Sequence, residues 1–282
     1  MMNKLQTAVL IFQSQDQPGI IAKISEFIFL NHGNIITADQ HSTDYCNGHF
    51  FIRIEFCFDP QKISLNQLHE NFHKIAIFFN AEWKIVSNTR LSMGILVSKA
   101  DHCLAELLYR WKSGELDVNI PFVIANHEHC KALVESYNIP FYYIPANASD
   151  HKETDMLKLV PKANFLVLAR YMQILSDEFI TSFKGDIINI HHSFLPGFKG
   201  ASPYQQAYDR GVKIIGATAH FVTKDLDEGP IIEQQVEHVS HRDSVNDLIL
   251  KGKNLEKLAL ARAVSLYVSY RIIRFQNKTI IF

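Results

Sequence analysis

IINIHHSFLPGFKG, residues 187–200, begins as an apolar strand and runs directly into a glycine-containing loop. Apart from Asn189, the strand has no polar face, which is typical of a strand buried on both sides in a parallel sheet. Asn189, His191 and His192 cluster where the strand ends. In an open α/β sheet the ligand binds outside this end, so the segment indicates both the fold class and the position of a site.

Strand and helix patterns alternate on both sides of this segment. Apolar strands are predicted over residues 91–98, 120–126, 139–145, 164–170 and 187–193. Helical segments separate them, so we predict a Rossmann-like α/β domain with a mostly parallel sheet covered by helices on both faces. Two further strands, 213–222 and 230–239, a long helix over about 244–270 and a short strand or hairpin complete the chain.

The first 88 residues follow a different pattern. HFFIRIEFCFD, residues 49–59, alternates apolar and polar side chains and predicts a strand with one buried face. The predicted order of elements is βαββαβ, with strands over 6–12, 34–43, 49–59 and 82–87 and helices over 19–32 and 63–79. This order is a ferredoxin-like unit. We therefore expect two domains, residues 1–88 and 89–282.

Composition limits the classes of partner. The chain has 28 Lys and Arg against 29 Asp and Glu, which argues against nucleic-acid binding and against a polybasic membrane patch. Its four cysteines form no CxxC pair, so we expect reduced thiols in a cytoplasmic protein. No apolar stretch approaches about 18 residues, and we expect neither a signal peptide nor a membrane span.

An acidic loop, TKDLDEG at residues 223–229, lies between the two later strands. Strands 187–191 and 213–222 would be neighbours in the simplest right-handed arrangement, and the loop would then fold back over the histidines. A carboxylate, an imidazole and a carboxamide would meet there. Taken separately, the loop also fits a solvated turn, and each histidine fits a strand end bonded to the backbone.

Other chemistries have weaker support. His191 and His192 lack the additional ligands that a zinc site needs, although a metal-assisted hydrolase using the acidic loop stays open. No GxSxG, GxGxxG or Walker motif follows a predicted strand. After strand 91–98, where a dinucleotide-binding protein has glycines, the chain continues with Lys99, Ala100, Asp101 and His102.

Residues 189–232 resemble the folate-dependent formyltransferase family, whose pattern is Asn-x-His, a Leu-Pro turn and a D-x-D-x-G-P loop. The spacing from His191 to Asp227 matches that family. LARYMQILSDEFI, residues 168–180, is similar to the stretch that seats the pterin in this family. The first 88 residues resemble an ACT domain, a small regulatory module, with its turn at DQPGI, residues 16–20.

The resemblance implies an activity and a set of site residues. It implies hydrolysis of 10-formyltetrahydrofolate to tetrahydrofolate and formate, which balances one-carbon folate pools and supplies formate for purine biosynthesis. Asn189 and His191 would donate to the formyl oxygen, and Asp227 would orient and deprotonate water. Neither a metal nor a cofactor is implied, since folate is the substrate and water the co-substrate. The implied folate contacts are Arg170, Tyr171, Met172, Ile174, Leu175, His192, Gly200 and His220.

Three questions stay open on the sequence. The formyl acceptor could instead be an amine such as glycinamide ribonucleotide, but residues 98–103 lack the glycines of a phosphate nest, leaving Lys99 as a point charge. A catalytically inactive amino-acid sensor is a third hypothesis. His192 either shapes the site for water or points into packing, and His220 either lies beside the site or is satisfied by the backbone.

The ACT-like unit has two interpretations. It is either a dimerisation module or the binding site for an amino-acid effector, for which glycine and methionine are the candidates. We expect a homo-oligomer, a dimer or a tetramer. The effector site is predicted at a subunit interface from Asp16, Gly19, Ile20, Gly33 and Asn34.

Overall fold

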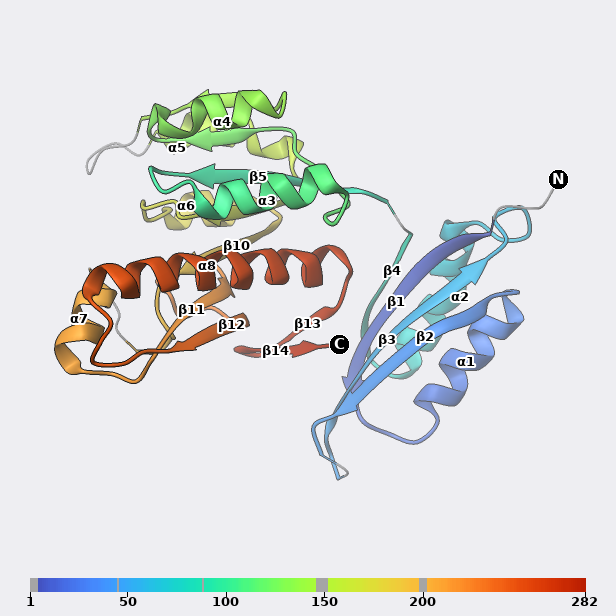
Figure 1. The fold of residues 1–282 in the computed structure, drawn as a ribbon. Helices are drawn as coiled ribbons and strands as arrows, with labels where there is room; N and C mark the ends of the chain where they lie inside the picture. Colours follow the sequence, from blue (N-terminus) through green and yellow to red (C-terminus); the bar gives the residue numbers. More distant parts are fainter. Residues whose placement is uncertain (1–4, 45, 88, 146–151, 198–201) are drawn as a thin grey trace. The chain divides into compact units, whose positions relative to one another are not determined.

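The computed structural model describes residues 5–44, 46–87, 89–145, 152–197 and 202–282, which form two compact units (Figure 1). Unit 1 comprises residues 1–89, 270–273 and 280–282, and unit 2 comprises 90–269 and 274–279. The last residues of the chain are thus divided between the units, whereas the sequence assigned all of them to the second domain.

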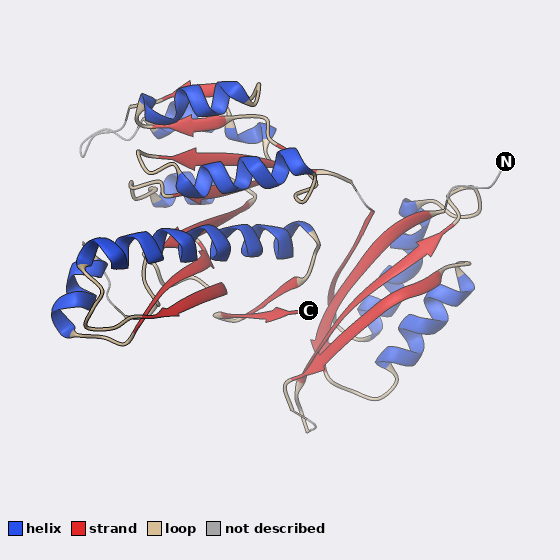
Figure 2. Ribbon diagram, in the orientation of Figure 1, coloured by secondary structure: helices blue, strands red, loops and turns tan. Residues whose placement is uncertain are grey.

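Unit 1 is a four-stranded antiparallel sheet with two helices, and the predicted βαββαβ order is confirmed (Figure 2). The sheet order is β2-β3-β1-β4. Its elements are β1 (Gln6–Gln15), α1 (Ile20–Leu30), β2 (Asn34–Ser42), β3 (His49–Phe58), α2 (Leu65–Phe78) and β4 (Glu82–Ser87).

The core of unit 1 follows from side-chain periodicity. Alternate residues of β3, such as Ile54 and Phe56, are buried against apolar residues of both helices. Phe72 of α2 lies at the centre, with its ring centroid 4.9 Å from those of Phe27 and Trp83. One sheet face covered by two amphipathic helices therefore forms the hydrophobic core of this unit.

Unit 2 contains a mixed sheet of order β12-β11-β10-β9-β5-β7-β8, with β6 paired to β5. The five strands from β8 to β10 are parallel, which confirms the mostly parallel sheet. The strands are β5 (Leu91–Val97), β6 (Val118–Asn119), β7 (Val123–Ala125), β8 (Phe141–Tyr143), β9 (Phe165–Ala169), β10 (Asp186–His191), β11 (Ile214–Phe221) and β12 (Ile231–His238).

Helices cover both faces of this sheet. Figure 1 shows α3 and α8 on one face, and apolar residues of α5 and α6 share a core with the other. The helices are α3 (His102–Ser113), α4 (Lys131–Ser136), α5 (Glu153–Leu157), α6 (Asp177–Ser182), α7 (Pro203–Arg210) and α8 (Val245–Val268). Short 3-10 turns span Glu128–Cys130 and Val160–Lys162, and the hairpin β13 (Ile272–Phe275) and β14 (Lys278–Ile281) ends the chain.

The strands β7 and β8 have only three residues each, fewer than the segments predicted for them. Pro121 and Pro140 precede them, and a proline has no N–H to donate to a neighbouring strand. The apolar side chains predicted the position of each strand, and the prolines limit its length.

One predicted arrangement is wrong. β10 and β11 are neighbours, but they are antiparallel rather than joined by a right-handed crossover. The connecting helix α7 has eight residues and so spans only about 12 Å. The chain therefore stays at the carboxyl end of β10 and returns along it as β11. Among the described residues, no helix is long and apolar enough to cross a membrane.

Replacing Phe72 with alanine should destabilise unit 1 by about 3–5 kcal/mol, because the ring is fully buried and its loss leaves a cavity. Chemical unfolding of the full chain, followed by tryptophan fluorescence, measures the change. Phe78→Ala is the matched control, since Phe78 is 74% exposed on the same helix. Equal destabilisation by the two substitutions would contradict this description of the core.

Candidate active site

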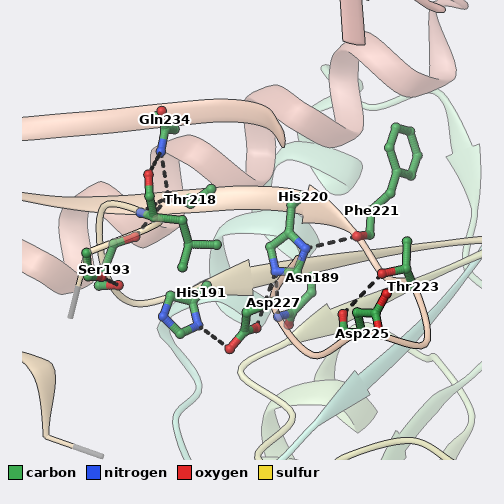
Figure 3. Close-up of polar contacts among 12 residues, drawn as sticks. Asn189, His191, Ser193, Thr218, His220, Phe221, Thr223, Asp225, Asp227 and Gln234 are labelled. Carbon is green, nitrogen blue, oxygen red and sulfur yellow. Dashed lines mark hydrogen bonds and ion pairs between the residues drawn. The ribbon is translucent and has the colours of Figure 1, made fainter. Parts of the chain in front are cut away.

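The register between β10 and β11 positions the first site residues. Asn189 pairs with His220, and His191 pairs with Thr218, so their side chains are cross-strand neighbours (Figure 3). Asn189 Nδ2 lies 3.2 Å from His220 Nε2. Side chains alternate along a strand, so Asn189 and His191 face the same side as Ile187, which belongs to the core under α5 and α6.

Asp227 reaches these residues from the loop between β11 and β12. Its Oδ2 lies 3.2 Å from His191 Nδ1, and its Oδ1 lies 3.5 Å from His220 Nε2. Figure 3 shows its carboxylate between the two rings. Its backbone has φ +56°, a left-handed conformation that aspartate tolerates better than most residues. Asp225 and Glu228 are exposed, and Asp227 is the loop carboxylate that reaches the histidines.

The bonds around His220 define its tautomer. Its Nδ1 lies 2.9 Å from the carbonyl oxygen of Phe221, so Nδ1 carries a hydrogen, and in that tautomer Nε2 accepts from the Asn189 amide. His220 is therefore satisfied by the backbone and also lies beside the site. Because an amide has two hydrogens, the second one on Asn189 Nδ2, which has no partner among the described residues, can be donated to a ligand.

Asp227 is held in its charged form. Burial alone would raise the pKa of this carboxyl, but its interactions with the His191 and His220 rings outweigh burial and lower the pKa well below its ordinary value. The carboxylate therefore stays ionised throughout the neutral range, and it fixes the hydrogen of His191 on Nδ1. The opposite nitrogen, His191 Nε2, is buried and has no hydrogen-bond partner among the described residues.

These side chains line a cavity of about 310 Å³. Seven of the predicted folate contacts line it with them: Arg170, Tyr171, Met172, Ile174, Leu175, His192 and His220. Tyr171 and Leu175 are buried, whereas Met172 and Ile174 are exposed. The eighth predicted contact, Gly200, lies outside the described residues. The structure thus gathers the predicted trio and the predicted folate contacts around one cavity.

His192 has contacts on both sides. Its ring centroid lies 5.2 Å from that of His191 and 6.3 Å from that of Tyr204 on α7. Burial, then the nearby positive charges of Arg170 and His191, lower the pKa of His192 to about 4. The ring is therefore neutral at physiological pH, and it lines the cavity while it also packs against α7.

Sequence reasoning missed the residues that hold the loop after β10. Thr218 Oγ1 accepts from Leu195 N at 3.0 Å and donates to the Ser193 carbonyl oxygen at 2.9 Å. Gln234 Nε2 donates to the same hydroxyl and to the carbonyl oxygen of Leu195. The turn contains a cis peptide bond between Leu195 and Pro196. The available signal was a pair of polar residues, Thr218 and His220, two positions apart in an otherwise apolar strand.

A second buried group was also missed. Glu256 of α8 is 1% exposed, and its carboxylate accepts from Tyr204 and His102 and lies 3.3 Å from Arg170 Nε. In the described part of the chain, His102, Cys103 and Glu256 are the group whose spacing would suit a metal ion. The guanidinium of Arg170 already supplies a positive charge there, so the donor set does not favour a cation.

The predicted effector residues lie at the two ends of α1. Gly19, with φ +94°, precedes the helix beside Asp16, whose Oδ2 accepts from Ser42 Oγ at 2.5 Å. Gly33 and Asn34 follow the helix, where a Cβ on Gly33 would lie 2.9 Å from the Ile28 side chain. An 11-residue helix is about 16 Å long, so one copy of the chain does not bring the two groups together.

Comparison with known proteins agrees with this geometry. A formyl transferase family model matches residues 92–264. The formyltetrahydrofolate deformylase of Synechocystis sp. is 47% identical over 98% of this chain and 98% of its own length. The crystal structure of a formyltetrahydrofolate deformylase from Pseudomonas syringae pv. tomato superposes with a TM-score of 0.93 at 41% identity, covering 100% of this chain and 96% of that one.

A phosphoribosylglycinamide formyltransferase from Anaplasma phagocytophilum is more distant. It is 31% identical with a TM-score of 0.63, and it covers 68% of this chain and 95% of its own. The deformylases match both units, whereas this transferase matches about two thirds of the chain. The chain therefore belongs to the formyltetrahydrofolate deformylase family.

Proposed function

We propose that this protein hydrolyses 10-formyltetrahydrofolate to tetrahydrofolate and formate. The observation that carries the proposal is the convergence of Asn189, His191 and Asp227 on one cavity, with His191 Nε2 buried and without a partner among the described residues. A buried polar atom without a partner is costly, and a polar group of a ligand would satisfy it. The family of the chain supports the same reaction.

The two donors stabilise the charge that forms on the formyl oxygen. Attack by water turns the formamide into a tetrahedral oxyanion, and each donor aimed at it typically contributes about 3 kcal/mol to lowering the barrier. Asn189 offers its second amide hydrogen. His191 donates through Nε2 when its ring is protonated, and the Asp227 carboxylate on Nδ1 stabilises that form.

Asp227 orients the attacking water, and the proton that the water loses is shared between Asp227 and His191. A carboxylate of low pKa is a weak base, so the proton belongs to the coupled pair rather than to either residue. The water oxygen bonds to the formyl carbon, and one of its protons passes to the pair. The pair delivers a proton to N10, the C–N10 bond breaks, and the formic acid released ionises to formate.

Formyl transfer to an amine has less support. The segment after β5 has no glycine-rich nest, and Ser98 Oγ in it accepts a hydrogen bond from Met172 N at 2.9 Å. The Ser98 hydroxyl is therefore already bonded to the backbone beside the cavity, rather than available to bind a phosphate. An inactive sensor would have no need of three reactive side chains meeting in one cavity.

We also propose the cofactor requirement, location and assembly of the protein. The hydrolysis needs no metal and no cofactor, since Asn189, His191 and Asp227 supply donors and a base. The four cysteines are free, in keeping with a cytoplasmic location. We also propose a homo-oligomer, dimer or tetramer, in which Asp16 to Ile20 of one copy and Gly33 to Asn34 of another form an amino-acid site for glycine or methionine.

The purified protein should release formate from 10-formyltetrahydrofolate when no amine is present. The measurement follows formate and tetrahydrofolate together, and their amounts should be equal. Addition of a chelator should leave the rate unchanged. An absolute need for an added amine would exclude hydrolysis, and zinc-dependent recovery after chelation would establish a metal mechanism.

Asp227→Asn should lower kcat by about 100-fold or more, since it removes the base from the pair. Asparagine also tolerates the left-handed backbone at this position, so folate binding should stay within a fewfold of the parent protein. Asp225→Asn, in the same loop but exposed, is the matched control. Turnover equal to that of the parent would remove Asp227 from the mechanism.

Glycine or methionine should change the rate of hydrolysis in the full-length oligomer. Asp16→Asn should raise the concentration needed for half of this effect about fivefold or more, because it weakens the turn before α1. Asp39→Asn, exposed on β2, serves as the control. The effector site would be wrong if both variants responded as the parent does.

A further inference from the structure

The order of strands in unit 2 reverses between β5 and β9. From β5 the chain moves outward through β7 to β8, and it then returns to the other side of β5 as β9. Open α/β sheets bind ligands at such a reversal, outside the carboxyl ends of the two strands. The helix α3 begins at this point, and the first turn of a helix attracts anions.

Side chains of the protein itself occupy the space at the carboxyl ends of β5 and β9. The Glu256 carboxylate lies 2.8 Å from His102 Nε2, the first residue of α3, and 2.7 Å from the hydroxyl of Tyr204. Arg170, which directly follows β9, lies 3.3 Å from the same carboxylate. We call His102, Arg170, Tyr204 and Glu256 the Glu256 cluster.

The cluster is charged although it is buried. Burial by itself would raise the pKa of Glu256, but the hydrogen bond from His102, the charge of Arg170 and the Tyr204 hydroxyl lower it. Buried ion pairs are often no better for stability than apolar residues of the same volume. Leu255, Ala259 and Leu260 around Glu256 are buried and apolar, so packing alone does not require a carboxylate in this part of α8.

Arg170 of the cluster lines the reaction cavity, and the other three members lie behind Arg170 and His192. Arg170 and His192 line the cavity together with Asn189, His191 and Asp227. Tyr204 packs against the His192 ring, and its hydroxyl donates to Glu256. Along β10, His191 faces the α6 side, and His192 is the next residue, so its side chain turns toward α7.

These positions divide the surroundings of the formyl group. The folate contacts Tyr171 and Leu175 belong to the core on the α6 side, and the Glu256 cluster occupies the other side. An acceptor must approach the formyl carbon from a direction that the folate leaves open. A bulky amine would meet His192 and Arg170, and an anionic one would also meet the Glu256 charge.

We propose that the Glu256 cluster determines acceptor specificity: it fills the acceptor side of the site, so that water reaches the formyl carbon and amines do not. The inference rests on the proposed hydrolysis. If the space were opened, an amine nitrogen would bond to the formyl carbon, the C–N10 bond would break, N10 would take the proton that the amine loses, and an N-formylamine would leave with tetrahydrofolate.

Two full-length variants test the proposal with two amines. His102→Ala opens space, and its side chain is 12% exposed, so its removal leaves Glu256 bound to Tyr204 and Arg170. Glu256→Gln keeps the shape and removes the charge. The probes are glycinamide, which is neutral as the free amine, and aminomethylphosphonate, which is anionic. Formate and the N-formyl product are measured in the same reaction.

The expected result is a change in the ratio of products. His102→Ala should raise the ratio of N-formylglycinamide to formate about tenfold or more, and Glu256→Gln should raise the ratio for aminomethylphosphonate more than that for glycinamide. His241→Ala, exposed and outside the cluster, is the matched control and should keep the parent ratio. A purely structural role would lower both products together and leave the ratio unchanged.

The outcomes separate the two proposals. If the parent protein releases no formate, the proposed function fails. If the parent hydrolyses its substrate and both folded variants keep its product ratio for both amines, the specificity role of the cluster is overturned. Circular dichroism establishes which variants are folded, and if one fails to fold, the product ratio of the other decides.

Discussion

The antiparallel pairing of β10 with β11 is the constraint on which the rest of the site depends. It sets Asn189 opposite His220 and His191 opposite Thr218, so two strands supply four of the polar side chains at fixed spacing. The same pairing directs the chain after Phe221 back over β10, which brings Asp227 to both histidines. A shift of one residue would turn each of these side chains to the opposite face.

Two groups of charged side chains lie near His192, and they differ in kind. Asp227 and its histidines border the cavity, so a substrate can compete for their hydrogen bonds. Glu256 has its partners entirely from the protein, on α3, α7 and the end of β9. The charges of Glu256 and Asp227 both raise the pKa of His192, but burial lowers it more, so the ring between the two groups is neutral. A neutral ring separates the two groups without adding a charge to either.

The sequence predicted much of this because the signals were local. Apolar runs marked the central strands, alternation marked β3, and the resemblance to the formyltransferase family identified Asn189, His191 and Asp227. The direction of β11 was not predictable in the same way, since strand patterns read the same in either direction and the length of α7 decided the outcome. Glu256 was not predictable, because its partners are distant in the sequence. Tyr204 is 52 residues away, Arg170 is 86 residues away, and His102 is farther still.

The division of the last residues between the units makes α8 part of the chain connection between them. The helix α8 holds Glu256 in unit 2, and two residues after its end Tyr270 belongs to unit 1, where its carbonyl oxygen accepts from Arg53 Nε of β3 at 3.2 Å. From Glu256 to the end of α8 the helix is about 18 Å of continuous hydrogen-bonded backbone. Glu256 and the residue that bonds to the sheet of unit 1 are therefore joined by one continuous stretch of backbone.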